Sequence, residues 1–121
     1  MIPKFRMWNK ITSKMHGVDG LYFDSEEVQY KDEVDVLRFI KFGNTILMQS
    51  TGLKDKNGKE IFEGDVVLVL DSPYTVFYDN ERGSYRLKPH DDRWNVDYMS
   101  NFSHGGNFEV VGNIYENKEY L

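Results

Sequence analysis

The stretch TGLKDKNGKEIFEGDVV, residues 51–67, places lysines, glycines and carboxylates at spacings close to those of ion-binding loops. A phosphate-binding loop reads G-x-x-x-x-G-K-[ST], so that backbone N–H groups surround the phosphates and a hydroxyl reaches Mg²⁺. Here Gly52 lies six residues before Gly58, one too many for that pattern. Glu60 follows Lys59, and its charge would repel phosphate. The sequence therefore argues against a phosphate loop.

The same stretch also departs from a calcium loop. Such a loop takes oxygen ligands at positions 1, 3 and 5, a glycine at position 6 and a glutamate at position 12. A register that starts at Asp55 puts Lys59 at position 5, Glu60 at position 6 and Val66 at position 12. Two interpretations remain: a tight turn before a buried strand, or an interaction loop. The candidate contact residues of that loop are Lys54, Lys56 and Lys59.

Other combinations that could support catalysis or hold a metal are sparse. The histidines share no spacing suited to a metal ion; they are His16, His90 and His104. The three carboxylates of Asp24, Glu26 and Glu27 lie close together in the sequence. This pattern favours a solvated acidic loop over an acid–base pair for catalysis. No Ser/His/Asp or Cys/His order is recognisable. We therefore expect no catalytic, metal-binding or cofactor-binding site and no enzymatic activity.

Aromatic and basic residues gather in one stretch near residues 82–94. In small nucleic-acid-binding barrels, such residues form a stacking platform with a cationic rim. The acidic residues Glu81, Asp91 and Asp92 lie in the same stretch and oppose this interpretation. An ordinary hairpin with cross-strand pairs is the alternative. The candidate nucleic-acid face consists of Arg82, Tyr85, Arg86, Lys88 and Trp94.

The composition bounds the class of protein. The chain has 121 residues, of which 40% are hydrophobic and 15% aromatic, and it contains no alanine. These values favour one mainly β domain with a real core. Cysteine is absent, which fits a reducing cytoplasm. No window approaches the ~20 apolar residues of a membrane span. The net charge of −5 opposes indiscriminate binding of phosphate.

Charge is distributed unevenly along the chain. Residues 1–14 carry basic side chains and no acid, whereas residues 19–35 carry seven acids against Lys31 alone. One interpretation is two differently solvated faces. The other is association of like chains, in which acidic residues 24–35 of one subunit meet the basic N-terminal segment or the 54–59 turn of another. A homo-oligomer is the partner that this pattern suggests.

Alternation of apolar and polar residues predicts strands along most of the chain. VVLVL, residues 66–70, predicts a buried strand, and residues 74–78 and 84–88 predict a hairpin. Asn57-Gly58 predicts a type I′ turn between strands that end near Asp55 and start at Lys59. Helical spacing near residues 95–103 predicts one short helix. Gly112, inside the last strand, suggests a bulge.

Together these elements predict an N-terminal β meander over residues 1–50 and a small SH3-like β-barrel over residues 51–121. No linker or repeat separates them. The expected core is Phe5, Leu37, Phe39, Leu47, Leu53, Ile61, Val67, Val69, Phe77, Val110 and Ile114.

Three motifs in order carry a family resemblance. They are PKFRMWNKITSKM near the start, LMQSTGLKDKNGKEIFEGDVV in the middle and FEVVGNIYENKEYL at the end. The chain resembles the YopX family of phage and prophage proteins, with its K-F-R-x-W, T-G-L-x-D-x-x-G-x-x-I-[YF]-E-G-D and E-V-[IV]-G-N-I-Y-E-N patterns. Two positions depart from the family: Asn9 stands where Asp is frequent, and Lys118 where Pro often follows.

The resemblance implies a phage-derived, cytoplasmic, mostly β protein that tends to self-associate, and it supplies no catalytic residues. We therefore expect a non-enzymatic protein–protein interaction module, with other phage or host proteins as further partners. The alternative is a nucleic-acid-binding module in phage replication or regulation.

Overall fold

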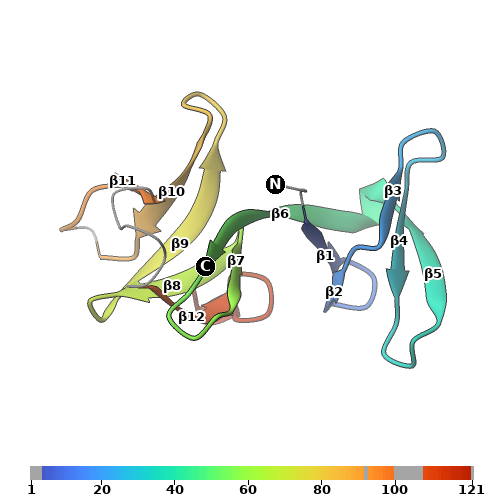
Figure 1. The fold of residues 1–121 in the computed structure, drawn as a ribbon, viewed down its shortest axis with the longest axis horizontal. Helices are drawn as coiled ribbons and strands as arrows, with labels where there is room; N and C mark the ends of the chain where they lie inside the picture. Colours follow the sequence, from blue (N-terminus) through green and yellow to red (C-terminus); the bar gives the residue numbers. More distant parts are fainter. Residues whose placement is uncertain (1–3, 92, 100–107, 121) are drawn as a thin grey trace. The chain divides into compact units, whose positions relative to one another are not determined.

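A computed structural model of the chain describes residues 4–91, 93–99 and 108–120, and it is mainly β, as predicted (Figure 1). The strands are β1 (Phe5–Asn9), β2 (Lys14–Gly17), β3 (Gly20–Tyr22), β4 (Glu27–Lys31), β5 (Leu37–Lys41), β6 (Thr45–Lys54), β7 (Glu60–Phe62), β8 (Asp65–Val69), β9 (Ser72–Asp79), β10 (Ser84–Pro89), β11 (Asp97–Tyr98) and β12 (Phe108–Asn113). The 3₁₀ turns η1 (Phe42–Asn44) and η4 (Lys118–Tyr120) also lie among the described residues.

The chain divides into two compact units, an N-terminal unit (Ile2–Gln49) and a C-terminal unit (Ser50–Leu121). Strand β6 belongs to both, because the division falls within it. Each unit has its own cluster of buried apolar side chains.

In the N-terminal unit, two sets of antiparallel strands pack around one hydrophobic core. Strand β1 pairs with β2 on one side and with the first half of β6 on the other, while β3, β4 and β5 form a three-stranded sheet in that order. The core consists of Met7, Val28, Tyr30 and Ile40. Within β4, Val28 and Tyr30 point into this core, so Glu27, Gln29 and Lys31 point to the opposite face.

The C-terminal unit contains a five-stranded sheet in the order β11-β10-β9-β8-β12, which curls into a half-barrel. The strand predicted over residues 66–70 is confirmed as β8 except at its end, because β8 stops at Val69 and Leu70 lies exposed in the turn that follows. The predicted hairpin is confirmed as β9 and β10, with Tyr78 opposite Tyr85. The predicted bulge at Gly112 is confirmed by a register shift between Val110 and Gly112. An SH3-like barrel, the finer description, remains a prediction.

The turn at Asn57-Gly58 joins β6 to β7, but it is not type I′. A type I′ turn needs positive φ at both central residues. Only Gly58 has it, with φ of 81°. The carboxylate of Asp55 shapes this turn instead, because its Oδ1 accepts the backbone N–H groups of Asn57 and Lys59, each at 2.9 Å. The predicted turn type is wrong because a buried side chain, not the backbone preference of Asn, sets the geometry of the turn.

Some predicted core residues lie elsewhere. Leu37 and Phe39 are exposed, because in β5 it is Ile40, their neighbour in the alternation, that faces the core. Phe77 is only half-buried, because Tyr74 and Val76 occupy the inner face of β9. Ile61, Val67 and Val69 are buried as predicted. Phe5, Leu47, Leu53, Val110 and Ile114 are half-buried.

The short helix predicted near residues 95–103 is wrong for the part of this segment that the structure describes. Asp97 and Tyr98 form strand β11, which pairs with Leu87 and Arg86 of β10. Pairing with an available sheet edge supplies hydrogen bonds that an isolated helical turn would lack. Residues 100–103 lie outside the described residues.

Candidate functional site

The outer face of the β3–β4–β5 sheet exposes a row of apolar side chains in the N-terminal unit. The strand register places Tyr22 beside Glu27, Phe39 beside Gln29, and Leu37 beside Lys31. Tyr22, Leu37 and Phe39 are 46%, 48% and 53% exposed. We call these three residues the apolar row.

Two of the three residues of the apolar row, Tyr22 and Phe39, contact each other. The rings of Tyr22 and Phe39 meet edge to face with centroids 5.8 Å apart. The Tyr22 hydroxyl donates a hydrogen bond to Oε1 of Gln29 at 2.7 Å. Because aromatic and aliphatic surface costs free energy in water, a pre-arranged row of this kind is typical of a contact surface.

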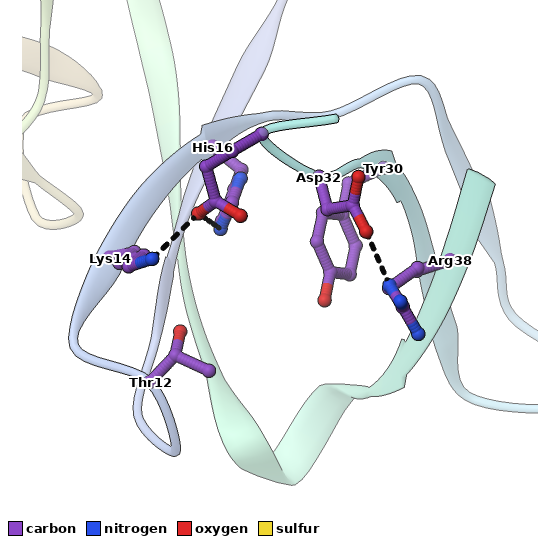
Figure 2. Close-up of a pocket in the computed structure, with 7 residues that line it drawn as sticks. Thr12, Lys14, His16, Tyr30, Asp32 and Arg38 are labelled. Atoms are coloured by element: carbon purple, nitrogen blue, oxygen red, sulfur yellow. Dashed lines mark hydrogen bonds and ion pairs between the residues drawn. The ribbon is translucent and has the colours of Figure 1, made fainter. Parts of the chain in front are cut away.

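The inner face of the same sheet, together with β2, borders a polar pocket with a volume of about 320 Å³ (Figure 2). His16 and Tyr30 line it with their rings 4.7 Å apart between centroids, and both side chains are largely buried. The hydroxyl of Tyr30 points into the pocket, and Thr12 lies across from it (Figure 2). The pocket is thus built from two segments distant in sequence, residues 12–16 and residues 30–38.

Two ion pairs border the pocket. Nε of Arg38 lies 2.6 Å from Oδ2 of Asp32, and Nζ of Lys14 lies 3.1 Å from Oε1 of Glu33 (Figure 2). Oδ1 of Asp32 also accepts the N–H groups of Val34 and Val36. The hydrogen bond from Arg38, assisted by the backbone donors, holds the pKa of Asp32 below its usual value. Asp32 is therefore ionised and well satisfied at neutral pH.

These pairs bear on the charge asymmetry seen in the sequence. Lys14 belongs to the basic N-terminal segment, and Glu33 belongs to the acidic stretch, yet they pair within one chain. Asp32 is likewise paired with Arg38. Part of the complementarity that suggested contact between subunits is therefore used inside the unit.

The lysines of the candidate interaction loop, Lys54, Lys56 and Lys59, are all exposed. The ammonium group of Lys56 lies 3.2 Å from the carboxylate of Glu109 on β12. Asp55, between Lys54 and Lys56 in the sequence, points inward and is only 6% exposed. Its Oδ2 accepts the backbone N–H of Val110 at 2.9 Å. The backbone N–H of Lys56 also donates to the carbonyl oxygen of Phe108 at 2.9 Å, so the turn is tied to β12 by a buried carboxylate, an exposed ion pair and a backbone hydrogen bond.

The candidate nucleic-acid residues divide between the two faces of the β9–β10 hairpin. Tyr85 faces the core, where it packs edge to face on Tyr78 with centroids 5.1 Å apart. Arg86 points to the opposite face, with its guanidinium 4.6 Å from the ring centre of Tyr98 and 3.1 Å from Asp79. Alternation along β10 makes this division unavoidable.

The remaining members of that group are more accessible. Arg82 pairs with Asp79 at 3.2 Å, so that one carboxylate binds both arginines. Lys88 and Trp94 are exposed, and Trp94 retains 54% of its accessible surface. The structure therefore brings Arg82 and Arg86 together at Asp79 and separates Tyr85 from Arg86 and Lys88.

Sequence reasoning missed the polar pocket, although part of its signal was present. Lys14 and His16 stand two residues apart in β2, and Tyr30 in β4 stands two residues before Asp32, which directly follows that strand. Each pair can therefore point to the same side. What the sequence did not supply was the packing of β2 near β4. A contact between non-consecutive strands is not encoded in the local pattern.

Among residues 4–91, 93–99 and 108–120, no group of three His, Asp or Glu side chains is placed to hold a metal ion. The described part of the chain also has no helix with the length and apolar character needed to cross a membrane.

Comparison with known proteins places the chain in a family. One solved structure, the crystal structure of protein EF1440 from Enterococcus faecalis, is similar over 100% of this chain and 99% of its own, with 30% sequence identity and a TM-score of 0.64. Comparison with curated proteins finds no match. The family described as YopX protein matches residues 4–121, and the chain therefore belongs to the YopX family.

Proposed function

We propose that this protein is a non-enzymatic interaction module that self-associates through the apolar row of its N-terminal unit. The observation that carries the proposal is the exposure of Tyr22, Leu37 and Phe39 on one face of a three-stranded sheet. Burying such side chains against a partner returns roughly 25 cal/mol for each Å² of apolar surface removed from water. The row is a surface that gains from being covered.

The charges beside the apolar row support a second copy as the partner. Glu27 and Lys31 lie on the same face of β4, each two residues from Gln29. A twofold axis in the plane of the contact, crossing the strands at Gln29, would reverse the strand direction of the second copy. Glu27 of each copy would then meet Lys31 of the other, giving two opposite-charge pairs around the apolar row.

Neighbouring charges leave this complementarity in place. The ammonium group of Lys41, beside Glu27 in the register, donates to the carbonyl oxygen of Ser25 at 3.0 Å. Asp32 and Glu33, which follow Lys31, line the inner pocket and pair there. Lys31 is therefore the basic group that remains at its end of the outer face.

Sedimentation equilibrium with the full chain tests the proposal. We expect a mass that rises toward that of a dimer with concentration at low salt, and a dissociation constant at least about tenfold weaker for Phe39→Ser. Leu70→Ser is the matched control, because Leu70 is 89% exposed in the other unit. It should leave association unchanged.

A charge exchange tests the symmetry of the contact. Glu27→Lys alone should weaken association, and Glu27→Lys combined with Lys31→Glu should restore it. A chain that stays monomeric at high concentration and low salt would remove the proposal. So would a dimer that Phe39→Ser does not affect.

The setting that we propose is the cytoplasm of a bacterial host during phage or prophage life, with other phage or host proteins as additional partners. Membership of the YopX family supports this setting. Recovering the tagged chain from induced host cells, beside the Phe39→Ser variant, tests which partners depend on the apolar row.

Nucleic-acid binding is the second candidate function, and the exposure of Lys88 and Trp94 favours it. Binding to labelled single- or double-stranded oligonucleotides should weaken between 50 mM and 200 mM salt if phosphate contacts contribute. An absence of binding at both salt concentrations would remove this candidate.

A further inference from the structure

We propose that the polar pocket of the N-terminal unit binds a small oxyanion, carried by a carboxylate or a phosphate ester. The pocket lies on the inner side of the sheet that presents the apolar row on its outer side, so the two proposals concern different side chains. Some polar groups around the pocket already have hydrogen-bond partners within the chain, and others do not.

The hydrogen-bond donors of the pocket are only partly used. Arg38 reaches Asp32 through Nε, and its two terminal nitrogens make no hydrogen bond within the part of the chain that the structure describes. A guanidinium has five N–H donors in a rigid fork that matches two oxygens of a carboxylate or phosphate. The two terminal nitrogens of the Arg38 guanidinium are therefore available to bind a ligand.

Tyr30 adds a second donor from a more enclosed position. The residue is 7% exposed, and it stands directly opposite Arg38 in the strand register. Its hydroxyl points into the pocket and has no hydrogen-bond partner among the described residues (Figure 2). The hydroxyl is reached from the pocket and is not one of the buried atoms that lack a partner, so a ligand oxygen in the pocket can accept a hydrogen bond from it.

The acceptors around the pocket are largely occupied, in contrast to the donors. Asp32 accepts hydrogen bonds from Val34, Val36 and Arg38. The carboxylate of Glu33 pairs with Lys14, and Nε2 of His16 lies 3.9 Å from the same oxygen. The surplus of free donors favours a ligand rich in acceptors over a cation.

The charges agree with a single anionic group rather than a highly charged polymer. Lys14 and Arg38 balance Asp32 and Glu33, so the pocket is close to neutral before His16 is counted. Asp32 faces three donors, which reduce its repulsion of a bound anion. Selection would therefore come from directed hydrogen bonds, chiefly from Arg38 and Tyr30, with the hydroxyl of Thr12 and the ammonium of Lys14 at the edge.

Titration of the ¹⁵N-labelled full chain with inorganic phosphate, citrate and chloride tests the inference by NMR. We expect saturable shifts of backbone amides in residues 12–16 and 30–38 with phosphate, citrate or both, and no saturation with chloride. The relative response to phosphate and citrate distinguishes the two sources of the oxyanion.

Two conservative variants test the donors. Tyr30→Phe removes the hydroxyl, and Arg38→Lys keeps the charge but removes the fork. Each should weaken binding about tenfold or more, because a hydrogen bond to a charged group is lost. Phe39→Ser, on the outer face of the same sheet, should bind the anion as the unmodified chain does, so failure of self-association and failure of this inference are distinguishable.

Saturation by neither phosphate nor citrate would overturn the inference. Unchanged affinity in folded Tyr30→Phe and Arg38→Lys variants, judged by spectra as well dispersed as those of the unmodified chain, would also overturn it.

Discussion

Leu70 occupies a backbone conformation that an L-residue rarely adopts. Its φ is 49°, and that of Asp71 is 68°, so the two residues form the centre of the tight turn between β8 and β9, where Val69 pairs with Ser72. Positive φ at both central residues is the signature of a type I′ turn. In this region, the Cβ atom of an L-residue crowds the carbonyl oxygen at a cost of about 1–2 kcal/mol.

We predict that Leu70→Gly is more stable than Leu70→Ala by about 1 kcal/mol. Both variants remove the same exposed side chain, and only glycine avoids the strain of its Cβ atom. The comparison is made by urea unfolding at neutral pH, with Leu70→Ala as the reference. Equal stability of the two variants would mean that the turn stores no strain at this position.

The same turn shows where residue-level prediction reached its limit. Asn57-Gly58 has the favoured residue types for type I′, yet it adopts another geometry, and Leu70-Asp71 has an unfavoured pair, yet it adopts type I′. The difference lies in what surrounds each turn. The hydrogen bonds of Asp55 determine the first, and the pairing of β8 with β9 determines the second.

At the scale of elements, Asp55 fastens the β6–β7 turn to β12. Its carboxylate accepts two N–H groups within the turn and one from Val110, which is 55 residues away in the sequence. Burial alone would raise the pKa of Asp55, but the N–H donors of Val110, Lys59 and Asn57 outweigh it and hold the pKa below its ordinary value. One side chain thus joins two segments of the C-terminal unit, the β6–β7 turn and β12.

We predict that Asp55→Asn destabilises the C-terminal unit by roughly 2 kcal/mol at pH 7, because the amide turns a donor toward one of three N–H groups. A depressed pKa means that this stabilisation is present above the unfolded value of about 3.9 and is lost as pH falls through the lower folded value. The difference in the free energy of unfolding between the unmodified chain and Asp55→Asn should therefore become smaller below about pH 4.

Urea unfolding at pH 7 and at pH 3 measures this gap, with Glu81→Gln as control because the Glu81 side chain is 89% exposed. Glu81→Gln should match the unmodified chain at both pH values. A gap for Asp55→Asn that is the same at pH 3 as at pH 7 would show that ionised Asp55 is not what fastens the turn.

Strands were predicted correctly where the local pattern of apolar and polar residues was strong. Which face of a strand is buried was not always predicted correctly. β8 was predicted from a run of apolar residues, and β9 and β10 were predicted as a hairpin from the alternation of apolar and polar residues. In β5, alternation puts Leu37 and Phe39 on one face and Arg38 and Ile40 on the other, but it does not say which face is buried, and the prediction that Leu37 and Phe39 are in the core was wrong. A single buried residue, Ile40, decides the orientation, because a strand turned by one residue exchanges its two faces.

At the scale of the whole molecule, the division into two units follows from two separate cores. Met7 belongs to the cluster of the N-terminal unit, and Ile61 belongs to that of the C-terminal unit; both are fully buried. The polar pocket lies within the first unit and needs β2 and β4 together. It could not be predicted from the sequence, because its two halves come from strands that are not neighbours along the chain.

Because packing energy depends on immediate neighbours, we predict that core substitutions act mainly within their own unit. Met7→Ala should lower the stability reported by amides of β4 by about 2–5 kcal/mol and change that reported by β9 and β10 much less. Ile61→Ala should do the reverse. Urea titration followed by ¹⁵N NMR resolves the two sets of amides in one experiment. If either variant shifts both sets equally, β6, the strand common to the two units, transmits the loss, and the chain unfolds as one cooperative body.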